Sequence, residues 1–199
     1  LTVKLGVIYK PGTLANIHVP TRTLGKQDSV WRKSISVSLG RHKLGYATYP
    51  TDGPTYNIYK VSGYMHKQFA KIHEIQFGLS LTYYDSYYTF IRFEDYYEYF
   101  KLPKSTVTTA HVAHEFLFKK FGFVTDLGIK IFDPFYRDFF ITEEKKNAIW
   151  SNGLITSKIG FEFYPFNTAF SGKKLSMGMF IKTNLAQADF VEYNLTYSF

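Results

Sequence analysis

Apolar and polar residues alternate along most of the chain, and the last nine residues show this pattern without a break. Every second position of residues 191–199 is aliphatic or aromatic, and the positions between them are polar. Because successive side chains of a β-strand point to opposite sides, this segment predicts a strand with one apolar and one polar face. Such a strand, ending the chain on Phe199, is typical of the closing strand of an outer-membrane β-barrel.

The same alternation recurs in earlier segments of about ten residues, which is the length that a tilted strand needs to cross a bilayer. Counted from Trp31, the pattern predicts eight strands. The expected fold class is all-β: a closed, eight-stranded, antiparallel transmembrane β-barrel of the outer-membrane type, with a lumen filled by side chains. The predicted strands cover residues 31–40, 59–69, 74–83, 107–118, 121–131, 154–164, 175–185 and 191–199.

The connections between these strands predict the orientation of the barrel. Outer-membrane barrels have short periplasmic turns and longer external loops, so a periplasmic C-terminus would place the longest connections outside the cell. The bacterial outer membrane is the expected location. The long connections are residues 41–54, 85–106 and 133–152; the short ones lie at residue 70, at 119–120 and at 165–173, with one short external turn at 186–187.

Residues 1–30 form a separate N-terminal segment, and the barrel is expected to occupy residues 31–199. Residues 2–9 alternate like a strand, and the stretch that follows, around Pro11 and Gly12, is typical of a loop. The short strand could pair at the seam of the barrel, replace one of the eight strands, or lie outside the wall. A barrel of this type needs a signal peptide, so we expect the numbering to start after its removal.

Composition agrees with a barrel and excludes other classes of protein. Aromatic residues make up 20% of the chain, which fits the aromatic belts found where hydrocarbon meets head groups. A helical membrane protein would need about 20 consecutive apolar residues, and the sequence contains no such run. The absence of cysteine excludes disulfides, thiolate metal sites and a cysteine nucleophile.

The chain carries a formal net charge of +8, and its basic residues are scattered along the sequence. They form no dense patch and no helix-turn-helix or zinc-finger spacing, so we expect no nucleic-acid partner. Lipopolysaccharide and other outer-membrane lipids are more natural partners for scattered cations beside aromatic belts. Other outer-membrane proteins are the further partners that we expect, and no cofactor is indicated.

Six charged residues fall on the polar faces of the predicted strands and would point into the lumen. Charges in such a narrow interior must pair, because little water reaches them. A structural ion network is the favoured interpretation, and a proton pathway or pore is the alternative. The six residues are Asp126, Lys130, Lys158, Glu162, Lys182 and Glu192.

Two further groups of residues have both a structural and a functional interpretation. His111 and Glu115 share one face of a strand, which favours a structural polar pair over metal ligation. Residues 83–100 are dense in aromatic and acidic side chains. An interfacial girdle with a packed loop is the simpler interpretation of this connection, and a docking surface for a protein or a glycan is the other.

Several segments resemble those of a known family of barrels, namely 114–116 (HEF), 133–140 (DPFYRDFF) and 188–192 (ADFVE). With its size and strand spacing, the chain from about Arg32 onward resembles the acyloxyacyl hydrolase group of Bacteroidota, which is similar to the PagL-type lipid A 3-O-deacylases. The resemblance implies a Ser nucleophile and a His base in a His-x-Ser-Asn motif on the penultimate strand. It also implies an orienting Glu on the last strand and a site on the lipid-facing wall near the outer leaflet.

The stretch closest to that motif is IKTN at residues 181–184. Asn184 keeps the Asn of the motif, and Thr183 takes the place of the Ser. The position of the His is occupied by Ile181, and a shift of the register by one residue gives no better match. No histidine follows His114, so the last four strands cannot supply an imidazole.

The carboxylate and the remaining base fall on the wrong face for this site. Alternation points Glu192, the only Glu of the last strand, into the lumen and away from Thr183; a β-bulge would be needed to reverse this. Lys182 is a chemically possible base, but it also points inward. An active wall site would have to use Thr183, Asn184, Glu192 and Lys182 as its candidate catalytic residues.

The favoured hypothesis is a non-catalytic PagL-like barrel that serves as a structural or accessory subunit of an outer-membrane protein complex. The alternative is a lipid A or acyl-chain ester hydrolase with a rearranged site, which requires an outward base within about 3 Å of the Thr183 hydroxyl. A third hypothesis is a soluble lipid-binding barrel, which would reverse the polarity and place its apolar residues inside.

Overall fold

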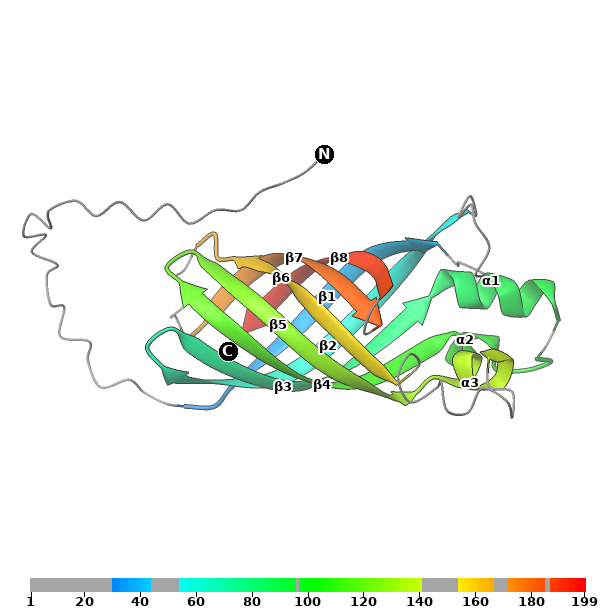
Figure 1. Cartoon of the computed structure of the whole chain (residues 1–199), viewed down its shortest axis with the longest axis horizontal. Helices are drawn as coiled ribbons and strands as arrows, with labels where there is room; N and C mark the ends of the chain where they lie inside the picture. The colour runs from blue at the N-terminus through cyan, green and yellow to red at the C-terminus, as the bar shows by residue number, and fades with distance from the viewer. Residues whose placement is uncertain (1–29, 44–53, 96, 141–153, 167–171, 185–186) are drawn as a thin grey trace, which may run out of the picture.

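The computed structural model describes residues 30–43, 54–95, 97–140, 154–166, 172–184 and 187–199. Within these residues eight strands form one closed antiparallel barrel, in which β1 pairs with β8 (Figure 1). The strands are β1 (Arg32–Lys43), β2 (Thr55–Ala70), β3 (His73–Tyr84), β4 (Thr106–Phe118), β5 (Phe121–Phe132), β6 (Ile155–Phe163), β7 (Lys174–Asn184) and β8 (Gln187–Ser198).

The closed eight-stranded topology confirms the fold predicted from the alternation. Most strand ends differ from the predicted ones by one to three residues. The two largest differences are the starts of β2 at Thr55 and of β8 at Gln187, each four residues early, because β2 stays paired with β1 as far as Lys43 and β8 with β7 as far as Asn184. Residues 1–29 lie outside the described residues, so the placement of the N-terminal segment stays a prediction.

The alternation along the strands produces an apolar outer surface and a polar lumen. On β1, Val37 and Leu39 point outward and are 52% and 59% exposed, whereas Ser36 and Ser38 between them are buried. An apolar band around a closed barrel fits the hydrocarbon core of a membrane. A soluble lipid-binding barrel needs the opposite polarity, so that hypothesis is wrong.

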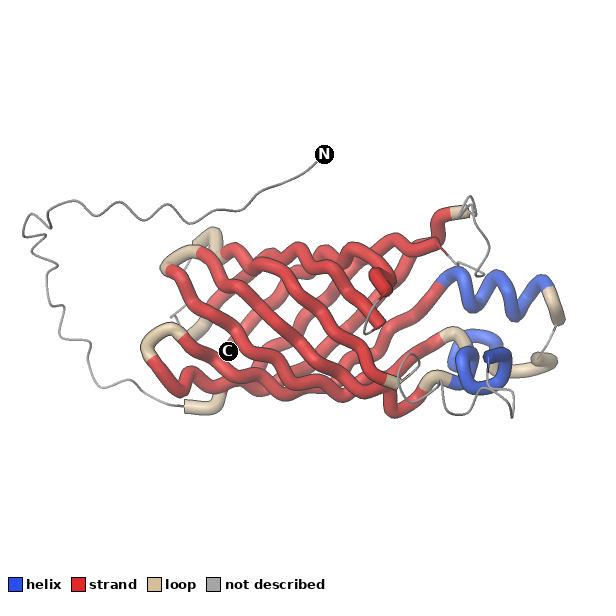
Figure 2. Tube along the Cα trace, viewed as in Figure 1, coloured by secondary structure: helices blue, strands red, loops and turns tan. Residues whose placement is uncertain are grey.

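Among the described residues, three short helices lie at one end of the barrel, and short turns between strands lie at the other (Figure 2). The helices are α1 (Asp85–Phe93) and α2 (Lys101–Lys104), between β3 and β4, and α3 (Pro134–Phe140), after β5. We call the two ends the helix-capped end and the hairpin end. None of the helices that the structure describes is long and apolar enough to cross a membrane.

Aromatic stacking fastens α1 and α3 to the rim of the barrel. Tyr87 of α1 stacks on Tyr84 at the end of β3 and on Phe135 of α3, with ring centroids 4.5 and 4.0 Å apart. Large buried rings dominate packing energy, so the helices and the rim form one packed unit. The adjoining buried apolar cluster consists of Ile58, Tyr84, Val107 and Phe190.

Candidate functional site

Thr183, the expected nucleophile of the wall, contacts another hydroxyl and not a base. It lies on β7 opposite Ser157 of β6, and the two side-chain oxygens are 2.5 Å apart. Each residue lies two positions from an outward-facing isoleucine of its own strand, Ile159 or Ile181, and so shares its face, which places the pair on the outer wall. Within the described part of the chain, Ser157 provides the only side-chain hydrogen bond to Thr183.

The residues next to Thr183 do not supply the missing base. Lys182 lies inside the barrel with 4% exposure, and its amine donates to the hydroxyl of Tyr84 at 3.3 Å. Asn184 has a buried side-chain oxygen that meets no donor among the described residues. Among the described residues, no outward base contacts the Thr183 hydroxyl, as an active wall site would require.

A β-bulge interrupts the pairing of β7 with β8, but it leaves Glu192 inside the barrel. The bulge falls between Lys182 and Thr183 of β7 and leaves Asp189 of β8 without a residue opposite it. Glu192 lies beyond the bulge, in the regular part of β8, and is 1% exposed. The bulge therefore changes the environment of Asp189 and does not bring the Glu192 carboxylate to the wall.

Glu192 is the centre of an ion network in the middle of the lumen. Its carboxylate lies 3.0 Å from the amine of Lys60 and 3.7 Å from the amine of Lys158. It also accepts a hydrogen bond of 3.0 Å from the hydroxyl of Ser38. Because these lysines and this serine hold the carboxylate inside, Glu192 cannot orient a base on the outer wall.

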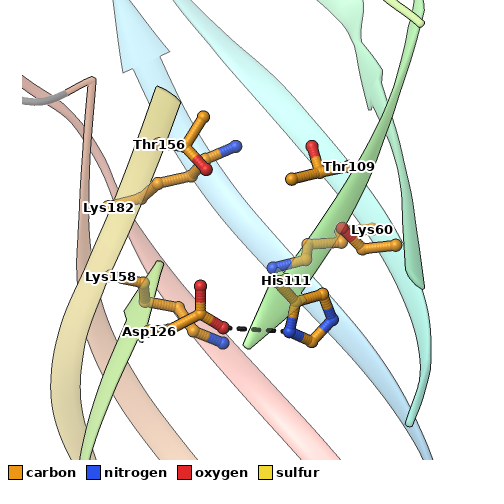
Figure 3. A pocket seen from close by; sticks show the side chains of 8 residues that line it. Lys60, Thr109, His111, Asp126, Thr156, Lys158 and Lys182 are labelled. Atoms are coloured by element: carbon orange, nitrogen blue, oxygen red, sulfur yellow. Dashed lines mark ion pairs between the residues drawn. The ribbon is translucent and has the colours of Figure 1, made fainter. Parts of the chain in front are cut away.

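The lumen beside Glu192 is filled by further polar side chains (Figure 3). Asp126 of β5 lies 3.1 Å from the Nδ1 atom of His111 on β4. Lys60, Lys158 and Lys182 line the same space and come from β2, β6 and β7. A narrow barrel packed in this way has no open channel.

A second network, nearer the hairpin end, contains Glu162. Its carboxylate accepts a hydrogen bond of 2.7 Å from Ser176 and lies 3.2 Å from the hydroxyl of Tyr164. The same hydroxyl lies 2.5 Å from Glu115. The predicted pairing of Glu115 with His111 is wrong, because four strand positions separate these side chains by about 13 Å.

The predicted set of lumenal charges omits several members that the structure brings together. Glu74, for example, lies 2.8 Å from His66 and 3.3 Å from Lys174. Alternation would have found most of them, since they lie on the polar faces of their strands. Lys130 of the predicted set pairs with Asp133 at 3.0 Å. The omitted residues are Lys60, His66, His111, Glu74, Glu115 and Lys174.

No cluster of three side chains suited to metal binding occurs among the described residues. Many lumenal acids and bases are instead paired with each other, and such pairing stabilises ions in an interior with little water. The geometry therefore shows a paired polar core inside the barrel and an outer wall without a hydrolytic constellation on β7.

Comparison with known proteins identifies the family of the chain. The family model for the C-terminal domain of acyloxyacyl hydrolase, PagL_C, matches residues 31–144, a range that covers β1 to β5 and ends before the wall segment of β7. No curated protein matches the chain. A solved structure from the de novo design of transmembrane β-barrels is similar, with a TM-score of 0.41 and 12% identity over 84% of this chain and 95% of the design. Because the family match spans more than half of the sequence, the chain belongs to the family of PagL-type acyloxyacyl hydrolase C-terminal domains.

Proposed function

We propose that this protein is a bacterial outer-membrane barrel without the wall hydrolase site of its family, and that it serves as a structural or accessory subunit of an outer-membrane protein complex. The observation that supports the proposal is the side-chain environment of Thr183, whose hydroxyl bonds to Ser157 and meets no base among the described residues. Ester hydrolysis by a hydroxyl requires a neighbouring group that takes its proton. At Thr183 the wall can contact lipid or protein, but no described residue there can take the proton of the hydroxyl.

In this proposal the helix-capped end faces the outside of the cell, and the hairpin end lies in the periplasm with Phe199. Outer-membrane barrels place their longer connections outside, and the connections that carry α1, α2 and α3 meet at one end (Figure 1). The scattered cations and aromatic residues of the chain would contact lipopolysaccharide and other outer-membrane lipids.

The helix-capped end also offers an apolar surface that a partner protein could cover. Phe93, Phe100 and Leu102 are 85%, 76% and 60% exposed, although they lie beyond the barrel strands. Phe100 has a φ of 63°, in the left-handed region that bulky residues rarely adopt. Exposed apolar side chains and a strained backbone are both enriched where proteins bind partners.

Purification from the native membrane in a mild detergent tests the accessory role. We expect a stoichiometric outer-membrane partner that is lost when Phe93→Ser and Phe100→Ser are combined. The matched control is Arg92→Ser, at an exposed position of the same helix, which should keep the partner. Heat-modifiable migration on a gel verifies that each barrel is folded, and a folded wild-type barrel that purifies alone would overturn the proposal.

A second measurement tests the loss of the wall site. Thr183→Ala should leave any release of acyl chains from lipid A by the purified barrel unchanged; release that Thr183→Ala abolishes would show that the wall is active. The second candidate function is an ester hydrolase with a rearranged site. One observation favours it: at the helix-capped end, the Ser86 hydroxyl lies 2.6 Å from the Nε2 atom of His42.

A further inference from the structure

A serine, a histidine and a carboxylate meet at the helix-capped end of the barrel. Ser86 Oγ lies 2.6 Å from His42 Nε2, and His42 Nδ1 lies 3.4 Å from Asp189 Oδ1. One nitrogen of the imidazole faces the hydroxyl and the other faces the carboxylate. This order of contacts is the one by which a carboxylate orients a histidine and the histidine activates a nucleophile.

We propose that Ser86 is the nucleophile of a site that hydrolyses carboxylic esters with an apolar acyl group. His42 is its general base, and Asp189 is the residue that positions the imidazole. This site would carry out the second candidate function, ester hydrolysis, and it uses none of the wall residues on β7. The accessory role and the Ser86 site can therefore fail independently.

Three local features of the chain bring these groups together. His42 continues the inward-facing series of β1 that includes Ser38 and Gly40. Ser86 lies in the first turn of α1, directly after β3. The bulge takes Asp189 out of the regular alternation of β8, and its side chain, only 12% exposed, reaches the imidazole. Bulges often turn a side chain in this way beside active sites.

The junction between β3 and α1 also provides donors for the carbonyl oxygen of a substrate. The first N–H groups of a helix have no partner within the helix. Tyr84, the residue before α1, makes no side-chain capping bond within the described structure. The first-turn N–H groups next to Ser86 can therefore stabilise the negative charge that develops on the carbonyl oxygen.

Aromatic side chains surround the imidazole and favour an apolar acyl group. The ring of His42 lies edge-on to Tyr84 and Tyr87, with centroids 5.4 and 6.3 Å apart. The hydroxyl of Tyr84 lies 3.4 Å from Asp189 Oδ2 and accepts a hydrogen bond from Lys182. The carboxylate is thus held by a second contact, which fixes its position beside the imidazole.

The proposed reaction needs only the ester and water. The oxygen of Ser86 attacks the carbonyl carbon while its proton moves to Nε2 of His42. The tetrahedral intermediate then loses the alcohol, which takes that proton as its C–O bond breaks. Water, deprotonated by His42, attacks the acyl-serine in the second half, and its proton returns to Ser86 as the carboxylic acid leaves.

Diisopropyl fluorophosphate tests the site, because it phosphorylates an activated serine, releases fluoride and shifts the protein mass. A small probe is needed because Ser86 is 1% exposed, so the reagent must displace part of the aromatic packing. For the full chain, folded in detergent, we expect one label that maps to Ser86 and is absent from Ser86→Ala. The variant His42→Gln should lower the labelling rate by on the order of 100-fold or more.

Two further variants separate catalysis from folding. Ser80→Ala removes another buried serine, on the lumenal face of β3, and should label like the wild type. Asp189→Asn should slow the labelling and shift the pH at which the rate is half-maximal, which a purely structural role would not do. Each variant must show heat-modifiable migration. A folded wild type without a label, a label elsewhere, or wild-type labelling of His42→Gln would overturn the proposal.

Discussion

Two buried carboxylates in this barrel are each held by more than one partner. Glu192 contacts Lys60, Lys158 and Ser38, and Glu74 lies between His66 and Lys174. Attraction between ions offsets their desolvation only when the geometry is good and further hydrogen bonds are present. At the scale of single residues, removal of one partner should therefore destabilise the barrel more than replacement of both partners by uncharged residues.

Glu192→Gln tests this argument because it leaves Lys60 and Lys158 buried without their shared carboxylate. We expect a loss of about 3–5 kcal/mol in the free energy of unfolding, measured by urea titration in lipid vesicles. Addition of Lys60→Met should recover part of the loss. Glu94→Gln, at an exposed position after α1, is the control and should change stability by less than about 0.5 kcal/mol. Equal midpoints for Glu192→Gln and the wild type would contradict the argument.

Two glycines provide a second test at the residue scale. A Cβ atom at Gly122 would collide with the carboxylate of Glu115, whereas a Cβ atom at Gly63 would meet nothing within 4 Å. Gly122→Ala should therefore displace Glu115 from Tyr164 and lower the free energy of unfolding by about 1–3 kcal/mol. Gly63→Ala, on the outward face of β2, should be neutral in the same unfolding titration. An unchanged free energy of unfolding in Gly122→Ala would mean that the network tolerates displacement of Glu115.

At the scale of elements, one side chain fastens α3 to the segment that joins α1 and α2. Asp138 accepts hydrogen bonds from Tyr97 and, at 3.1 and 3.0 Å, from Lys104 and Arg137. Burial raises the pKa of Asp138, but the hydrogen bonds outweigh this effect and hold its pKa below the usual range. A carboxyl with a lowered pKa stabilises the folded form above its unfolded pKa, and this contribution disappears as the pH falls through the folded pKa.

Acidification from about pH 6 to pH 3 should therefore loosen the contact between α3 and α2. Hydrogen exchange of the α2 and α3 amides, corrected for intrinsic rates, should accelerate in the wild type over this interval. In Asp138→Asn the exchange should already be fast at the higher pH and change little. The strands serve as the internal control, and an identical pH response of both proteins would show that Asp138 does not fasten the helices.

The strands could be predicted from the sequence, but the helices and the bulge could not. Apolar residues at every second position over about ten residues, as in β8, indicate a strand and fit few other structures. The helices are short, and their aromatic side chains give no clear helical stripe. No local signal marks Asp189 as an extra residue in β8. The inward position of Glu192 thus follows from alternation, whereas the contact between Asp189 and His42 requires the closed barrel.

The whole molecule has an apolar exterior and a polar, ion-paired interior. This polarity determines how much a charge on the outer face destabilises the barrel. At an exposed position of a soluble protein, a new charge costs little stability. In a membrane the cost depends on depth, and it is largest at the middle of the hydrocarbon. Leu127 and Ile131 of β5 are similarly exposed, at 58% and 60%, but Leu127 lies near the middle of the strand and Ile131 near its end.

Leu127→Arg should therefore destabilise the barrel by about 2–4 kcal/mol in a bilayer, and Ile131→Arg by about 1 kcal/mol or less. The two variants differ only in depth, so the ratio of their effects separates a membrane position from a general loss of packing. Urea titration of the barrels in lipid vesicles measures both free energies. Equal and small effects would mean that the apolar band does not face hydrocarbon, and equal and large effects would mean that β5 packs against protein along its whole outer face.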